Sequence, residues 1–217
     1  VLASVAVLAI AGSATAIALA DNTTTGAGAK PSAPAITEVP PRIGSEYPAL
    51  SKPRDASEAR QLPAVEAVMS RVAERGEQAA NSGANTEFAR RISQNGESAE
   101  YLIPGNEVLC MVSITMNHTT GDGCAPSSSV ESTGTTSLTV VPGGYELSGI
   151  LPTGTTNISI TNTSKQTTLV PANPNHAFEF FSATPLQKLS YALPTGGTHE
   201  GSLELPPPRN APPPPAG

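Results

Sequence analysis

Tryptophan is absent from this sequence of 217 residues, and only four tyrosines and four phenylalanines are present. Basic residues are scarce in the second half, where Lys165 and Lys188 alone oppose the nine acidic residues between Glu97 and Leu205. Proteins that bind nucleic acids need a basic surface, which in many of them is interleaved with aromatic side chains. An acidic segment without such a stripe repels phosphate, so we expect no nucleic-acid partner. The net charge of −6 implies no other partner and is ordinary for an extracellular surface.

The common catalytic motifs are missing as well. Ser148 lacks the first glycine of a G-x-S-x-G turn, and no second histidine completes H-E-x-x-H after His199-Glu200. No pair of carboxylates forms a recognisable glycosidase motif. We therefore expect a protein that is not an enzyme and has no catalytic, cofactor-binding or metal-binding residues. The alternative is a secreted hydrolase with an unfamiliar site, which would need His118, His176 or His199 beside a carboxylate and a serine.

Charge is also absent from residues 1–20, which are almost entirely apolar. Two interpretations stay open for this segment. The small-x-small sequences at 14–16 and 18–20 suit cleavage of a signal peptide, whereas twenty apolar residues are also just long enough to span a bilayer as a helix. We slightly favour an uncleaved anchor, which would make the membrane a partner of the chain. Both interpretations place the rest of the protein outside the cytoplasm, either anchored to the membrane or secreted.

The next two segments differ in their capacity to fold. Residues 21–53 are rich in Thr, Gly, Ala and Pro and contain no run that could bury a face, so we predict a disordered stalk. Residues 54–96 form a predicted helical segment. Its main helix is Ser57–Arg75, which carries Leu62, Val65, Val68, Met69 and Val72 on one face at helical spacing. A second, shorter helical turn is predicted from Asn85 through Phe88 to Ile92.

From residue 97 to residue 205 the hydrophobic period changes to two, which is typical of strands. Turn clusters rich in Gly, Pro, Asn and Thr separate the strands at spacings near ten residues. The predicted strands are Glu100–Ile103, Val108–Met116, Ser137–Val141, Tyr145–Leu151, Thr156–Thr161, Gln166–Val170, Ala177–Ser182, Lys188–Leu193 and Ser202–Leu205. The predicted class is therefore α+β and mainly β: an N-terminal apolar helix, a short helical segment, and a small antiparallel β sandwich or barrel-like domain. Residues 206–217 read as a disordered, proline-rich tail.

Cys110 and Cys124 are the only cysteines. In an exported chain such a pair most commonly forms a disulfide. The bond would close a loop of about 15 residues and contribute roughly 3 kcal/mol of stability in the chain-entropy model. A metal site would need His118 and a fourth ligand, and the scattered histidines give no spacing typical of a metal site. The polar loop Thr115–Gly123, held at both ends by the disulfide, is the first place we would expect a binding surface.

These features together resemble a group of uncharacterised exported or membrane-anchored proteins of actinobacteria. The resemblance rests on the strand Tyr101-Leu102-Ile103-Pro104-Gly105 leading to Leu109-Cys110, on a second cysteine, and on the turn Gly149-Ile150-Leu151-Pro152-Thr153-Gly154. It also includes the opening Leu50-Ser51-Lys52-Pro53 and the arginine-rich turn Ala89-Arg90-Arg91-Ile92. The chain departs from the group at Thr153 and Thr155, where Asp and Val are common. The resemblance implies an extracytoplasmic cell-envelope protein and brings no activity with it.

The sequence therefore favours an exported, non-enzymatic binding or structural module of the cell envelope. Its partner is expected to be a cell-envelope component or another protein, which the sequence does not identify.

Overall fold

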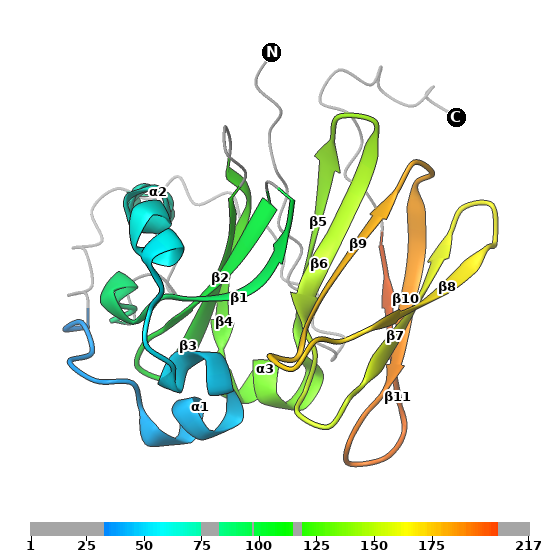
Figure 1. Cartoon of the computed structure of the whole chain (residues 1–217). Helices are drawn as coiled ribbons and strands as arrows, with labels where there is room; N and C mark the ends of the chain where they lie inside the picture. Colours follow the sequence, from blue (N-terminus) through cyan, green and yellow to red (C-terminus); the bar gives the residue numbers. More distant parts are fainter. Residues whose placement is uncertain (1–32, 75–82, 97, 115–118, 204–217) are drawn as a thin grey trace, which may run out of the picture.

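Three antiparallel β-sheets and one long helix form four stacked layers in the computed structural model of the chain (Figure 1). The structure describes residues 33–74, 83–96, 98–114 and 119–203, with only the backbone described for 119–122. The order of the layers is helix α2, sheet A, sheet B and sheet C. Eleven strands lie within the described residues, so the expectation of a mainly β protein is confirmed. The strands form three sheets, whereas the sequence predicted a single sandwich or barrel-like domain.

The strands of sheet A follow one another in chain order, whereas the chain passes back and forth between sheets B and C. Sheet A has the order β1-β2-β3-β4, sheet B the order β5-β6-β9, and sheet C the order β11-β10-β7-β8. The chain thus leaves sheet B after β6, forms β7 and β8 of sheet C, returns as β9, and completes sheet C. The strand bounds are Arg90–Asn95 (β1), Ser98–Pro104 (β2), Val108–Ile114 (β3), Thr119–Pro126 (β4), Thr135–Val141 (β5), Gly144–Ile150 (β6), Asn157–Asn162 (β7), Thr167–Pro171 (β8), Ala177–Ser182 (β9), Leu186–Ala192 (β10) and Thr198–Ser202 (β11).

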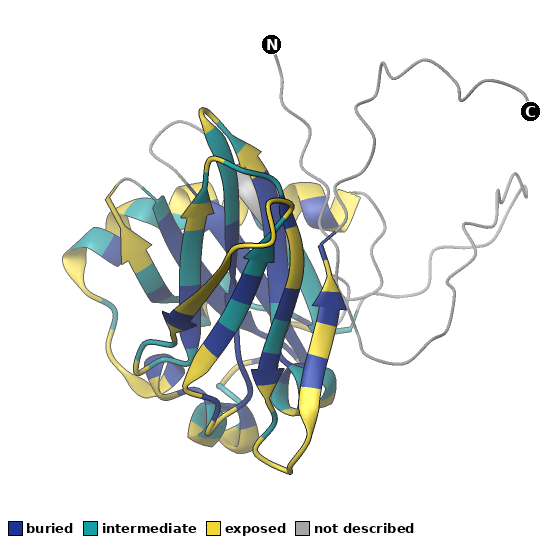
Figure 2. Ribbon diagram, turned by 90° about the vertical axis from the view of Figure 1, so that its right-hand side faces the viewer, coloured by how far each residue is buried: buried dark blue, intermediate teal, exposed yellow. Residues whose placement is uncertain are grey.

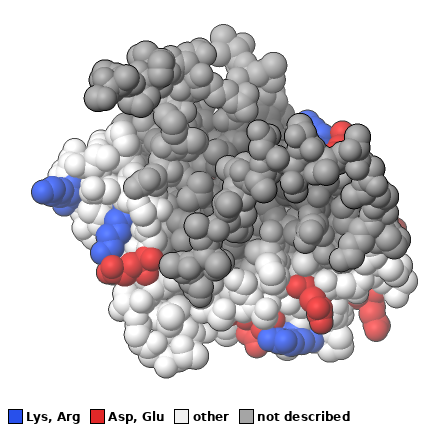
Figure 3. Space-filling model, turned by 180° about the vertical axis from the view of Figure 1, so that it is seen from behind, with Lys and Arg blue, Asp and Glu red and all other residues white. Residues whose placement is uncertain are grey.

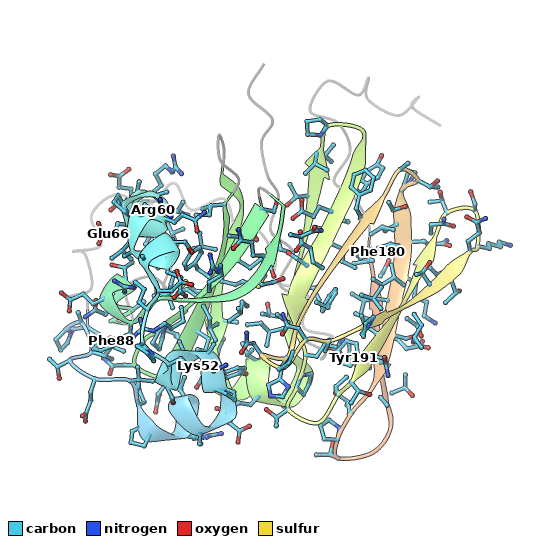
Figure 4. The ribbon with its side chains drawn as sticks, viewed as in Figure 1. Lys52, Arg60, Glu66, Phe88, Phe180 and Tyr191 are labelled. Atoms are coloured by element: carbon cyan, nitrogen blue, oxygen red, sulfur yellow. A yellow bond between two sulfur atoms is a disulfide. The ribbon has the colours of Figure 1, made fainter. Side chains whose placement is uncertain are left out.

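Helix α2 (Ala56–Glu74) packs against the outer face of sheet A. The start of the predicted helix Ser57–Arg75 therefore agrees with the structure to within one residue, and its last residue, Arg75, lies outside the described residues. Its apolar stripe of Val65, Val68 and Val72 is buried against alternate residues of β2 and β3, which include Tyr101 and Val112. The opposite face of α2 is charged and exposed, and Figure 4 shows Arg60 and Glu66 on it.

The start of α2 is fixed by a capping box, in which two side chains satisfy backbone N–H groups that have no partner within the helix. Asp55 Oδ1 accepts from the N–H groups of Ser57 and Glu58 at 2.7 and 2.8 Å. In return, Glu58 Oε2 accepts from the N–H of Asp55 at 2.7 Å. Glu58 Oε1 also accepts from the N–H of Arg91 in β1 at 2.6 Å, so the same carboxylate ties α2 to sheet A.

Short helices close the end of the molecule where sheets A and B meet. They are α1 (Pro41–Glu46), the 3-10 helix η1 (Pro48–Ser51) and α3 (Ser127–Thr133), which links β4 to β5. Ile43 of α1, Leu50 of η1 and Tyr47 between them are buried in a cluster with Val130 of α3. Residues 41–51 are therefore folded, although the sequence analysis assigned 21–53 to a disordered stalk. A few large apolar side chains between prolines are enough for this, because they complete a core that other elements provide.

Three apolar clusters fill the spaces between the layers. The first lies between sheets A and B at the α3 end, the second between sheets B and C, and the third between α2 and sheet A. The outer face of sheet C meets solvent, and Figure 2 shows the resulting alternation of buried and exposed residues along its strands. Sheet B is thus covered on both faces.

The structure also corrects two predicted elements. The helical turn expected from Asn85 to Ile92 is limited to the 3-10 helix η2 (Thr86–Phe88), which Asn85 caps, and β1 begins at Arg90. Strand β1 therefore belongs to the segment predicted to be helical. The predicted strand Ser202–Leu205 instead runs from Thr198 to Ser202, and β4 was not predicted at all. Residues 1–32 and 204–217, which hold the predicted anchor or signal peptide and the proline-rich tail, lie outside the described residues.

Candidate functional site

A layer of polar side chains lies between sheets A and B, next to the apolar cluster at the α3 end. On sheet A, Ser93, Glu100 and Ser113 are cross-strand partners on β1, β2 and β3. On sheet B, Glu179, Ser148 and Ser137 are cross-strand partners on β9, β6 and β5. Side chains alternate between the two faces of a strand, so each set forms a row across its sheet. Two interactions join the rows, one between Ser93 and Glu179 and one between Ser148 and Glu100. We call these six residues the polar layer.

Glu100 is the most deeply buried acidic group of the described residues, with 1% of its surface exposed. Its Oε1 accepts a hydrogen bond of 3.1 Å from Ser113 Oγ, whereas its Oε2 has no hydrogen-bond partner among the described residues. Burial raises the pKa of Glu100 to about 8, against the smaller opposing effects of the Ser148 and Ser113 hydroxyls. The negative charge of Glu179 adds to the increase. At neutral pH the Glu100 side chain is therefore mainly a neutral carboxylic acid.

Glu179 faces the same layer from sheet B. Its Oε2 lies 3.5 Å from Ser93 Oγ, which donates a long hydrogen bond across the A–B interface. Partial burial and then the charge of Glu146 raise the pKa of Glu179 to about 7. Burial also raises the pKa of Glu146, which is two residues before Ser148 on β6. Three carboxyl groups thus face one interface, and each is held toward its neutral form.

A bulge in β1 adds a second polar link between the same two sheets. The register of β1 with β2 shifts between Arg91 and Ser93, so Ile92 lies at the bulge. The carbonyl oxygen of Ile92 accepts hydrogen bonds from the side-chain amides of Asn173 and Asn175, at 2.8 and 3.1 Å. Both asparagines belong to the turn between β8 and β9. This turn therefore anchors the start of β9, which carries Glu179, to sheet A.

The histidines considered in the sequence analysis are not brought together in the described structure. His199 of β11 is 9% exposed and its ring stacks on Tyr191 of β10, with the ring centroids 4.9 Å apart. Burial lowers the pKa of His199 and so favours its neutral form. His176 lies in the β8–β9 turn, where its backbone carbonyl accepts from Leu151. His118 lies outside the described residues.

A shallow crevice lies beside His199. It is lined by Thr133, Gly134, Thr135, Thr136, Leu189, Tyr191 and His199, and is too narrow to enclose a water molecule. The Tyr191 hydroxyl donates to the carbonyl of Thr133 and so uses its polar group within the protein. Figure 4 shows Tyr191 and Phe180 in the space between sheets B and C, where both contribute to the apolar cluster. The crevice therefore reads as a junction between packed elements.

The disulfide between Cys110 and Cys124 is confirmed. The two residues are direct cross-strand partners on β3 and β4, and Cys110 is fully buried beneath α2. The loop that we expected to be a binding surface, 115–123, is partly strand, because β4 begins at Thr119. Residues 115–118 lie outside the described residues.

The polar layer was not predicted, although the sequence contains a signal for it. Glu100 lies between the apolar residues Ala99 and Tyr101, and Ser148 and Glu179 each lie two residues from a buried apolar residue on the same face. Such positions are usually read as the solvent-exposed side of a strand. These polar residues can be recognised as buried only when it is known that other layers cover both faces of sheet B.

No protein-family model, curated protein or solved structure matches this chain. Among the described residues, no group of three or more histidine, cysteine or acidic side chains is placed to hold a metal ion. The helices of the described part are all too short or too polar to cross a membrane. On the face shown in Figure 3, the basic and acidic side chains of the described residues are scattered.

Proposed function

We propose that this protein acts outside the cytoplasm as a non-enzymatic binding or structural module of the cell envelope. The observation that carries the proposal is the disulfide Cys110–Cys124, which joins β3 to the edge strand β4 of sheet A. Disulfides form and persist in oxidising compartments and are rare where thiols are kept reduced. The apolar segment 1–20 supports the same location, and attachment to the membrane through it belongs to this proposal. A relationship to the exported actinobacterial proteins that the sequence resembles is also part of this proposal.

The arrangement of the ionisable groups favours binding or a structural role over catalysis. A general acid or base must reach the substrate within hydrogen-bond distance. Glu100, which has the strongly raised pKa expected of such a group, is almost completely enclosed by protein. Likewise, His199 has one face of its ring against Tyr191. These groups are better placed to hold the layers together than to act on a substrate.

The location can be tested by adding a membrane-impermeant protease to intact cells that produce the full chain. We expect the folded part to be accessible from outside and the two cysteines to resist alkylation until a reductant is added. Protection of the chain until the cells are lysed, together with free thiols, would overturn the extracytoplasmic proposal.

One observation favours a hydrolase as the second candidate. Glu179 is partly exposed and has a pKa of about 7, which suits a general acid at neutral pH. A screen of the purified protein against wall glycans, esters and peptides separates the two functions. Turnover that disappears in Glu179→Gln and persists in Glu200→Gln, an exposed control on sheet C, would replace the non-enzymatic proposal with this one.

A further inference from the structure

The contact between sheets A and B changes character along its length. At the α3 end it is apolar, with Ile92 and Leu102 of sheet A packed in one cluster with Ile150 and Ala177 of sheet B. One step further along the strands it becomes the polar layer. A further step along β9 brings Phe181, which is 54% exposed. The two sheets are therefore held by apolar packing at one end and by polar groups toward the other.

The polar layer is incompletely satisfied. Glu100 Oε2 and Ser137 Oγ are both buried and both lack a hydrogen-bond partner among the described residues. Ser137 belongs to the row of sheet B that faces Glu100, so the unpaired groups are contributed by both sheets. A buried polar group without a partner weakens the folded state, and a buried charge without a partner weakens it far more. The stability of this contact therefore depends on whether its carboxyl groups are neutral.

No described side chain facing Glu100 could compensate its negative charge. The neighbours on its own sheet are uncharged: Ser93 and Asn95 of β1, Ser113 of β3, and Gly121 of β4 opposite Ser113. Those facing it from sheet B are Ser137 and Thr139 of β5, Glu146 and Ser148 of β6, and Glu179 of β9. The nearby Arg91 of β1 is bonded to Asp55 and Ser57 at the start of α2. The charged groups in this set are all acidic, so ionisation adds repulsion between the sheets to the cost of burying a charge.

We propose that the A–B interface is a pH-controlled contact, closed while Glu100 and Glu179 are protonated and opened at the end away from α3 when both carboxyl groups ionise. The apolar cluster around Ile150 holds the sheets together at the α3 end, so the opening is local. Both carboxyl groups have folded-state pKa values above those of free glutamic acid. Protons are therefore bound more tightly by the closed form, which is favoured at low pH and lost as the pH rises through about 7 to 8.

Opening would expose the inner faces of β2, β6 and β9, with Phe181 at the edge of the new surface. Outside the cytoplasm this surface would follow the pH of the medium. That consequence depends on the proposed location, whereas the opening itself does not. A test on the purified full chain therefore separates failure of this inference from failure of the proposed function.

The experiment is hydrogen–deuterium exchange of the full chain at pH 5.5 and 8.5, with each rate divided by its intrinsic value at that pH. We expect amides of β2, β6 and β9 to lose at least about tenfold in protection at pH 8.5, relative to amides of β10 in sheet C, since each unit of pKa difference is a factor of ten. Equal losses in all sheets, or no loss, would overturn the proposal.

Two variants and a matched control sharpen the test. Glu100→Gln together with Glu179→Gln should abolish the pH-dependent loss, because neither amide can ionise. Glu200→Gln removes an exposed carboxylate paired with Lys188 on sheet C and should behave like the unmodified chain. If the double variant fails to fold, Glu179→Gln alone carries the test, since Glu179 is only partly buried. A pH-dependent loss in Glu179→Gln as large as in the unmodified chain would then count against the proposal.

Discussion

Glu100 lies directly opposite Ser113 in sheet A, and the serine hydroxyl donates a hydrogen bond of 3.1 Å to Oε1 of the Glu100 carboxyl group. The second oxygen of this carboxyl group is buried and unpaired. A strand that is apolar on either side of Glu100 thus carries an acidic group that is favourable only when neutral. This relationship leads to the first prediction.

The free energy of unfolding should fall as the pH rises. The pKa of Glu100 is about 8 in the folded state and about 4.5 as a free side chain, so the folded protein binds more protons between these values. We expect the contribution of Glu100 to the free energy of unfolding, measured with urea, to decrease by about 4 kcal/mol between pH 5 and pH 9. In Glu100→Gln this contribution should be absent, which leaves the smaller pH dependence contributed by Glu179. A pH profile that is identical in the variant and the unmodified chain would show that Glu100 is not the titrating group.

Reduction of the disulfide should lower the thermal midpoint by about 10 °C. The bond links residues 14 positions apart, and a loop of this size contributes about 3 kcal/mol in the chain-entropy model. The measurement compares thermal unfolding with and without a reductant, with free thiols counted before heating. An unchanged midpoint after complete reduction would mean that the cross-strand bond adds nothing to the stability of sheet A.

Asn173→Ala should destabilise the protein by about 2 kcal/mol. The Asn173 side chain donates to the Ile92 carbonyl and accepts from the N–H groups of Asn175 and Ala177. All three bonds are lost in alanine, and the carbonyl at the β1 bulge retains only the Asn175 amide. The matched control is Asn157→Ala, in which an exposed side chain loses one bond to Thr156. Equal urea midpoints for the two variants would contradict the importance of the bulge contact.

Gly149→Ala should destabilise by about 3 kcal/mol. A Cβ atom at this position of β6 would lie 2.3 Å from the Thr135 carbonyl oxygen and 3.0 Å from the Phe178 ring. The first of these atoms is backbone and cannot rotate away. Gly44→Ala in α1 is the control, because its Cβ would meet only ordinary contacts at 3.5 Å and alanine favours helix. Thermal unfolding should rank the control at or above the unmodified chain.

Much of the fold could be predicted where the sequence pattern is local. Alternation of Ile158 and Ile160 with polar residues predicted β7, and the apolar stripe with Val65 and Val68 predicted α2. Strand β4 was missed because its sequence, TTGDGCAP, has no alternation and is a strand through pairing with β3. Strand β1 was missed because Ile92 and Phe88 lie at helical spacing, whereas the capping carboxylate of Glu58 binds the β1 backbone.

The candidate site could not be predicted for a related reason. Glu100, Ser148 and Glu179 come from three strands of two sheets, and nothing in the local sequence indicates that those sheets face each other. Their polarity at alternate positions is the same pattern that a solvent-exposed face produces. What identifies them is burial, which depends on sheet C covering the other side of sheet B.

Strand β6 has a consequence for how the molecule responds as a whole. Its odd-numbered residues Tyr145 and Leu147 belong to the apolar contact with sheet C, and its even-numbered residues Glu146 and Ser148 belong to the contact with sheet A. A displacement of β6 would therefore alter its contacts with sheet A and with sheet C at the same time. Tyr145 and Leu147 share an apolar cluster with Phe178 of β9, so ionisation of the carboxyl groups would act on a strand that also packs against sheet C.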